Sequence, residues 1–127
     1  MDYQALIIGA GIAGSEAALV LAKRGLKIGL LTQSLDTVYL PFTPLFEQGP
    51  EGSLMAQVGA PGKKGWELHS KAKYILEAEP NIHLFQSSAT GLIVENNHVK
   101  EVSCTGPSGP VRVFPTFRAQ AAGESGE

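Results

Sequence analysis

Three glycines near the start of the chain constrain its fold more than any other feature. They stand in the run Gly9-Ala10-Gly11-Ile12-Ala13-Gly14, which has G-x-G-x-x-G spacing. This run follows the short apolar segment 3–8 and opens 12–24, which is rich in alanine and leucine. A second apolar run, 26–32, comes next. The order strand, glycine turn, helix and strand predicts a βαβ unit, whose crossover makes the two strands parallel.

Each glycine has a physical task in this context. Gly9 permits a tight turn, Gly11 lets a pyrophosphate approach the backbone, and Gly14 lets the helix pack closely on the strand. The free N–H groups at the start of the helix then face the anion. The motif therefore predicts a dinucleotide-binding turn at residues 9–14. The alternative is a glycine-rich turn that binds nothing.

Two polar residues follow the last glycine. Ser15 either donates to a phosphate or lies in the first turn of the helix without contacting a ligand. A carboxylate beside a phosphate would be repelled, so we expect the side chain of Glu16 to point away from the anion.

The residues after the second strand bear on which dinucleotide binds. An acidic side chain about 20 residues after the motif would hold the adenosine ribose. The chain reads Thr32-Gln33-Ser34-Leu35-Asp36 there, so no carboxylate stands at the end of the strand itself. Thr32 or Gln33 would bond a ribose hydroxyl more weakly, and Asp36 either caps a turn or contacts the ligand. These residues alone leave both FAD and NAD open.

Beyond the βαβ unit the sequence pattern changes. Residues 33–65 are rich in proline and glycine, and we predict a long loop without structure of its own. Segment 66–78 has helical spacing, and 82–85 is a third strand candidate. Three short apolar runs separated by Asn and Gly-Pro turns predict a three-stranded antiparallel meander over 89–114. Residues 115–127 are polar and small, which predicts a disordered tail.

Composition excludes several classes. The 127 residues suit one domain, which we place at 1–114, and the net charge of −2 leaves no segment basic enough to indicate nucleic-acid binding. A single cysteine, Cys104, excludes an internal disulfide and a cysteine-based zinc site, and it fits a reducing, cytoplasmic compartment. We expect Cys104 to be buried rather than nucleophilic. The three histidines lack metal-ligand spacing, and no apolar stretch is long enough to span a membrane.

Two stretches resemble the amino-terminal flavin domain of the GidA (MnmG) family, which modifies the wobble uridine of tRNA. They are GAGIAGSEAA at 9–18 and LLTQSLDT at 30–37, and segment 81–96 is similar to the same family after its long connection. Within this family, the sequence resembles the short GidA-related proteins, which lack the tRNA-binding parts. The resemblance implies an α/β, Rossmann-type FAD-binding domain with a parallel sheet and an antiparallel meander. It places the FAD pyrophosphate at 9–14 and the adenine beside the backbone of Ala89.

The sequence also departs from this family. Segment 38–46 lacks the Ser-Cys-Asn-Pro sequence and the glycine-rich stretch of the tRNA-modifying members. We therefore expect no activity on tRNA and assign no catalytic residue. Pro115 and a polar tail stand where the family continues into an apolar strand, which suggests a truncated or frame-shifted chain. The expected function is FAD binding in a flavin-dependent oxidoreductase lineage. An NAD-binding domain and a non-catalytic nucleotide-binding remnant are the alternatives.

Overall fold

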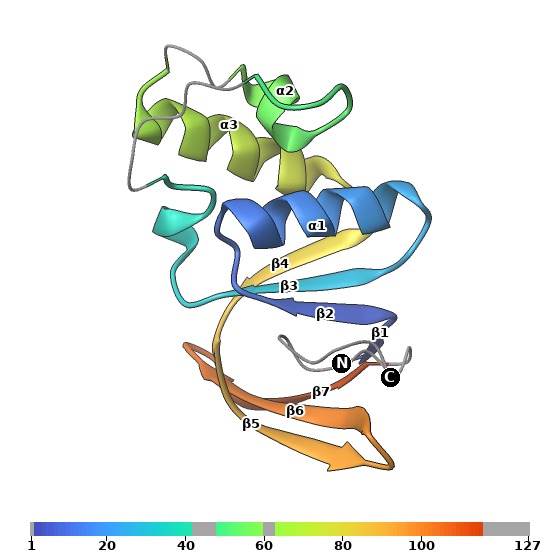
Figure 1. The fold of residues 1–127 in the computed structure, drawn as a ribbon. Helices are drawn as coiled ribbons and strands as arrows, with labels where there is room; N and C mark the ends of the chain where they lie inside the picture. The colour runs from blue at the N-terminus through green and yellow to red at the C-terminus, as the bar shows by residue number, and fades with distance from the viewer. Residues whose placement is uncertain (1, 42–47, 60–62, 116–127) are drawn as a thin grey trace.

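The fold consists of two sheets and a layer of helices (Figure 1). The computed structural model describes residues 2–41, 48–59 and 63–115. A parallel sheet has the strand order β2-β3-β4 and is built from β2 (Ala5–Ile8), β3 (Ile28–Thr32) and β4 (Ile82–Gln86). A second sheet has the order β1-β7-β6-β5 and is built from β1 (Asp2–Tyr3), β5 (Ser88–Glu95), β6 (His98–Gly106) and β7 (Gly109–Pro115).

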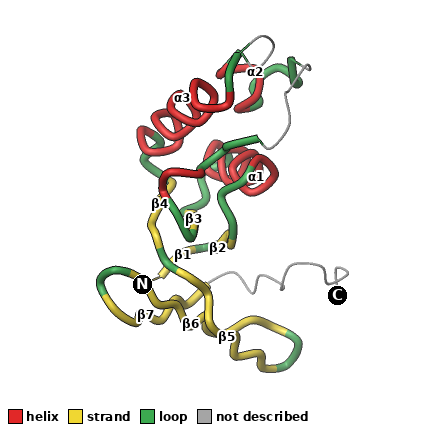
Figure 2. The backbone as a smooth tube through the Cα atoms, turned by 90° about the vertical axis from the view of Figure 1, so that its left-hand side faces the viewer, coloured by secondary structure: helices red, strands yellow, loops and turns green. Residues whose placement is uncertain are grey.

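The helices cover one face of the parallel sheet, and the second sheet lies on the other side (Figures 1 and 2). They are α1 (Ile12–Lys23), the short α2 (Leu54–Val58) and α3 (Gly65–Ala78). None of the helices in the described ranges is long and apolar enough to cross a membrane.

Two hydrophobic cores result from this layering. The first lies between the helices and the parallel sheet and includes Leu30. The second lies between the two sheets and includes Leu31 together with Tyr3 and Val113. All five residues of β3 are buried, because each face of this central strand is covered by a different layer.

The predicted βαβ unit is confirmed. β2 pairs parallel with β3, from Ala5 opposite Ile28 to Ile8 opposite Leu31, and α1 connects them. The predicted single strand over 3–8 is wrong in one respect, because it is two strands that join different sheets. The chain bends at Gln4, where the carbonyl of Lys27 accepts from the N–H groups of both residues 4 and 5.

The prediction that 33–65 lacks structure of its own is also corrected. This stretch contains a 3-10 helix, η1 (Leu35–Thr37), in addition to α2. Serine side chains start both helices: Ser34 Oγ accepts from the N–H of Asp36, and Ser53 Oγ accepts from the N–H of Ala56. These two N-caps are local sequence signals, and a prediction based on the proline and glycine content did not take them into account. Residues 42–47 and 60–62 of this stretch lie outside the described residues.

The carboxy-terminal apolar runs form β5, β6 and β7. β5 pairs antiparallel with β6, and β6 pairs antiparallel with β7. Strand β7 continues to Pro115 and also pairs with β1 in parallel. The predicted tail lies outside the described residues from position 116 onward.

Candidate functional site

A cavity of about 330 Å³ lies at the edge of the parallel sheet where its strands end. Its lining comes from the ends of β2 and β3, the glycine turn, the segment after β3, and the chain entering β5. The lining residues are Ile8, Gly9, Ala10, Gly11, Leu31, Thr32, Gln33, Thr37, Leu40, Ser87 and Ala89. In open α/β sheets, ligands bind at this carboxyl edge, and the volume is in the range of small-ligand sites.

The structure brings together most, but not all, of the predicted site residues. Six of the ten line the cavity: Gly9, Ala10, Gly11, Thr32, Gln33 and Ala89. Ile12, Ala13 and Gly14 form the first turn of α1 next to it, and Asp36 lies in η1 outside the lining.

The glycine turn has the geometry of an anion site. Gly9 adopts a φ of +109°, which is strained for any residue with a side chain, and its N–H donates to Leu31 O at 2.8 Å. Gly11 is the N-cap of α1, and a Cβ added there would meet nothing within 4 Å. No side chain caps this helix. The first N–H groups of α1 therefore have no side-chain cap, and the space at Gly11 leaves room for an anion to approach them.

Ser15 and Glu16 both have partners within the protein. Ser15 is fully buried, and its Oγ donates to the carbonyl of Ala10 at 3.1 Å, so this hydroxyl supports the turn rather than a ligand. The carboxylate of Glu16 accepts hydrogen bonds from the N–H groups of Leu54 and Met55 at the start of α2. It is therefore held against another helix, and Glu16 does not line the cavity.

The residues at the end of β3 are not equally available to a ribose. Thr32 Oγ1 donates to the carbonyl of Ser34 at 2.8 Å and accepts from its N–H at 3.2 Å, so this hydroxyl already closes a turn. Gln33 is exposed and lines the cavity. Ser34, not Asp36, caps η1. Gln33 is therefore the best placed of the three predicted residues.

The chain between β4 and β5 forms the far end of the cavity. The N–H of Ser87 donates to Thr32 O at 2.8 Å, which holds this connection against the end of β3. The Ser87 hydroxyl is buried beside the Cys104 thiol but makes no hydrogen bond of normal geometry within the described residues. A buried unpaired hydroxyl at a cavity is a feature that a polar ligand atom would satisfy.

Cys104 is a structural residue. Its side chain is buried in the second core. Burial raises the pKa of the Cys104 thiol, and the hydroxyl of Ser87 opposes this only in part. The prediction that Cys104 is buried is confirmed. Elsewhere in the described part of the chain, no group of three or more His, Cys, Asp or Glu side chains is placed to hold a metal ion.

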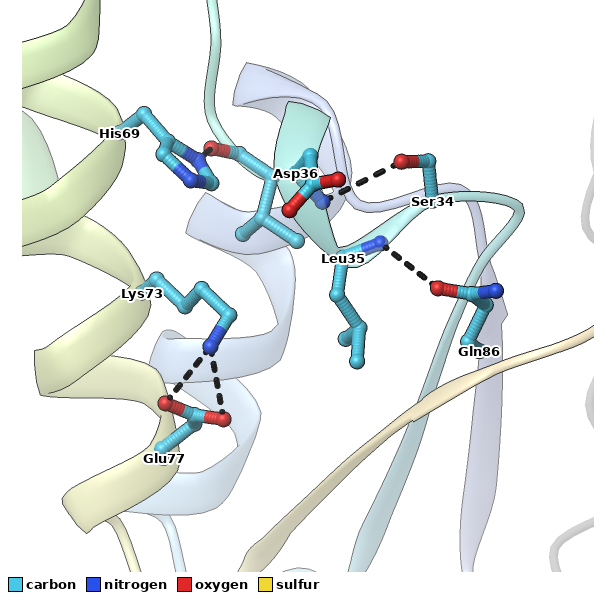
Figure 3. A network of polar contacts seen from close by, with 8 residues as sticks. Ser34, Leu35, Asp36, His69, Lys73, Glu77 and Gln86 are labelled. Carbon is cyan, nitrogen blue, oxygen red and sulfur yellow. Dashed lines mark hydrogen bonds and ion pairs between the residues drawn. The ribbon is translucent and has the colours of Figure 1, made fainter.

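The segment after β3 forms one wall of the cavity. Side chains from distant elements hold this segment in place (Figure 3). The N–H of Leu35 donates to Gln86 Oε1 at the end of β4. His69 Nδ1, from α3, donates to the carbonyl of Val38 at 2.6 Å. The N–H of Tyr39 donates to the carbonyl of Ala10 in the glycine turn at 2.9 Å. Thr37 and Leu40 line the cavity from this wall.

Sequence reasoning missed five lining residues: Ile8, Leu31, Thr37, Leu40 and Ser87. Ser87 was within reach of prediction, because it follows the third strand candidate and the carboxyl ends of parallel strands meet at one edge. Thr37 and Leu40 carried no such signal, because contacts with distant residues position them.

The parallel sheet, the glycine turn and the cavity at the sheet edge together define a Rossmann-type α/β fold. The observed residues fit the diphosphate and adenosine part of a dinucleotide, because they offer uncapped amides, an unpaired hydroxyl and an apolar floor. The family profile described as glucose inhibited division protein A matches residues 4–67, and the chain belongs to this family, GidA. The resemblance predicted from the sequence is confirmed.

Individual relatives agree with this assignment. The chain is 34% identical over 133 aligned positions to the tRNA uridine 5-carboxymethylaminomethyl modification enzyme MnmG of Alkaliphilus oremlandii. It is similar to the crystal structure of the GidA-related protein from Thermus thermophilus, with a TM-score of 0.76 and 46% identity. Aquifex aeolicus GidA has the same fold, with a TM-score of 0.74 at 21% identity.

The chain corresponds to only part of each relative. The match covers 80% of this chain but 21% of the Alkaliphilus enzyme. It covers 87% of this chain and 49% of the Thermus protein, and 90% of this chain and 24% of the Aquifex protein. The chain therefore spans about a fifth of the first and about half of the second.

Proposed function

We propose that this chain binds FAD through its ADP part, as the FAD-binding domain of a GidA-like flavoprotein. The observation that carries the proposal is the cavity at the carboxyl edge of the parallel sheet, which begins at an uncapped α1 behind the glycine turn. Anions bind at such helix starts because the N–H groups and the helix dipole both attract negative charge.

We assign the parts of the ligand by following the strand order. The ends of β2, β3 and β4 lie side by side in that order, and neighbouring strands are about 4.8 Å apart. The pyrophosphate lies at residues 9–14 after β2, and the ribose lies by Gln33 after β3, with Thr32 behind it and Asp36 at the margin. The adenine lies by Ser87 and Ala89, which follow β4.

The remaining elements support this assignment to a flavoprotein. Strands β5, β6 and β7 serve as the meander insertion of the FAD-binding version of the fold, and residues 1–114 act as one unit. When bound, the flavin supplies the redox chemistry, while the protein supplies binding and orientation. Because segment 38–46 has no cysteine, we propose no activity of this chain on tRNA.

Two variants with opposite expectations test the proposal. At both Gly11 and Gly91 an added Cβ would meet nothing within 4 Å, and neither residue has a positive φ. Gly11→Val would fill the space in front of the turn, whereas Gly91→Val places the same side chain on β5 outside the cavity. Titration of the purified protein with FAD, followed by flavin fluorescence, is expected to show binding by the wild type and Gly91→Val but not by Gly11→Val.

Competing ligands separate the alternative functions. ADP is expected to displace FAD, whereas FMN, which lacks the adenosine part, is not. Binding of NADH in place of FAD would favour the NAD-binding alternative. If neither FAD nor NADH changes the thermal midpoint, the non-catalytic remnant is the better description.

A further inference from the structure

The carboxylate of Glu16 connects three separate parts of the molecule. It leaves α1 two residues after the last glycine of the motif, and its Oε1 accepts from the N–H of Leu54 at 2.8 Å. Its Oε2 accepts from the N–H of Met55 at 2.9 Å and from the hydroxyl of Tyr39 at 2.8 Å. A single side chain therefore joins α1, the start of α2, and the segment that walls the cavity.

Glu16 completes the N-terminus of α2. The first N–H groups of a helix have no partners within the helix and need others. In α2, the first two donate to Glu16 and the third donates to Ser53 Oγ. Leu54 and Val58 of this helix are fully buried in the first core. The carboxylate thus fixes where α2 docks, and its charge also suits the positive end of the helix dipole.

Tyr39 carries this connection to the cavity. Its side chain is fully buried, yet its backbone has a φ of 54°, which non-glycine residues rarely adopt. Such a conformation persists only where surrounding contacts hold it. Here the contacts are the bond from Tyr39 N–H to Ala10 O in the glycine turn and the bond from its hydroxyl to Glu16. Thr37 and Leu40, on either side of Tyr39, line the cavity.

We propose that Glu16 is a positioning residue that couples occupancy of the cavity to the docking of α2. This inference rests on the proposed FAD binding, but Glu16 itself does not line the cavity. The carboxylate holds Tyr39, and Tyr39 holds both the wall and the carbonyl of Ala10. A ligand that fills the cavity contacts the wall at Thr37 and Leu40, and it therefore favours the same position of Tyr39 as the carboxylate does. Because coupling between sites is reciprocal, FAD stabilises the docked α2 as much as α2 strengthens FAD binding.

The test compares Glu16→Gln with Glu67→Gln. The control is matched, because Glu67 also accepts a backbone hydrogen bond at a helix start, from the N–H of Lys64 at α3, but neither Glu67 nor Lys64 lines the cavity or belongs to the segment that walls it. In Glu16→Gln the amide group can accept only at its oxygen, so at least one of the three donors is left facing an NH₂. We expect Glu16→Gln to raise the Kd for FAD about tenfold, within the usual range of coupling between sites. Glu67→Gln should leave the Kd unchanged.

A second measurement detects the coupling directly. Hydrogen exchange of the Leu54 and Met55 amides in the wild type is expected to slow when FAD is added, although neither residue lines the cavity. In Glu16→Gln this slowing should be lost. A role in stability alone would leave the Kd unchanged, and FAD would then slow these amides no more than the amides that exchange only by global unfolding.

The outcomes are distinguishable. A wild-type protein that binds no FAD overturns both the proposed function and this inference. A wild type that binds FAD, with a Glu16→Gln variant that binds equally well or with Leu54 and Met55 amides that ignore the ligand, overturns the inference alone.

Discussion

Gly14 of α1 lies directly against the carbonyl group of Gly9, so that a Cβ added at position 14 would stand 1.9 Å from Gly9 O. This contact is the close packing of helix on strand that the motif requires. It involves two backbone segments, neither of which can rotate aside as a flexible side chain would.

Replacing Gly14 with alanine should therefore destabilise the protein itself and not only a ligand site. Overpacking in a close-packed region typically costs about 1–3 kcal/mol. Urea denaturation followed by circular dichroism measures the change. Gly11→Ala serves as the control, because its Cβ meets no atom within 4 Å. Equal stability of the two variants would contradict the close contact.

Ser87→Ala should separate ligand affinity from stability. Removing a buried hydroxyl that makes no hydrogen bond of normal geometry is nearly neutral or slightly stabilising for the free protein. If the hydroxyl bonds the bound ligand, its loss should weaken FAD binding about fivefold, since a neutral hydrogen bond contributes about 1 kcal/mol. Thermal midpoints with and without FAD measure both effects. A large loss of stability without ligand would mean that the hydroxyl has a partner in the protein.

Glu79 should make the protein sensitive to acid. The hydrogen bond from Lys23, helped by the N–H of Asn81, lowers the pKa of Glu79 against an opposing effect of burial. A carboxyl group with a lowered pKa in the folded state contributes stability above its unfolded pKa, about 4.3, and loses it as the pH falls through the folded value. Glu79→Gln should flatten this decline in the free energy of unfolding below about pH 4. An unchanged acid profile would show that other carboxylates determine it.

The thiol of Cys104 should react slowly in the folded protein. It is buried, and burial raises its pKa, so both access and the fraction of thiolate are reduced. We expect labelling by a thiol reagent at about pH 8 to proceed only after unfolding by denaturant. Rapid labelling of the native protein would show that the second core opens readily.

The part of the fold that was predictable from sequence is the part that local patterns determine. The glycine motif, the apolar runs around it and the helix between them predict the βαβ unit, because each signal lies within a few residues of the element that it forms. The same patterns, with the family resemblance, predicted six of the residues that line the cavity.

The remaining features depend on contacts between residues distant in sequence. The bend at Gln4 depends on the carbonyl of Lys27, and the docking of α2 depends on Glu16, more than 30 residues before it. The wall of the cavity depends on Gln86 and His69 from elements that follow much later. No periodicity or turn signal near position 37 carries this information.

Leu31 belongs both to the floor of the cavity and to the core between the two sheets. Substitutions in the antiparallel strands, for example at Val102 or Val113, can therefore change the shape of the floor through Leu31 while every residue of the glycine turn stays the same. Related chains with identical motifs could in this way diverge in which nucleotides they accept, through changes at residues that never touch the ligand.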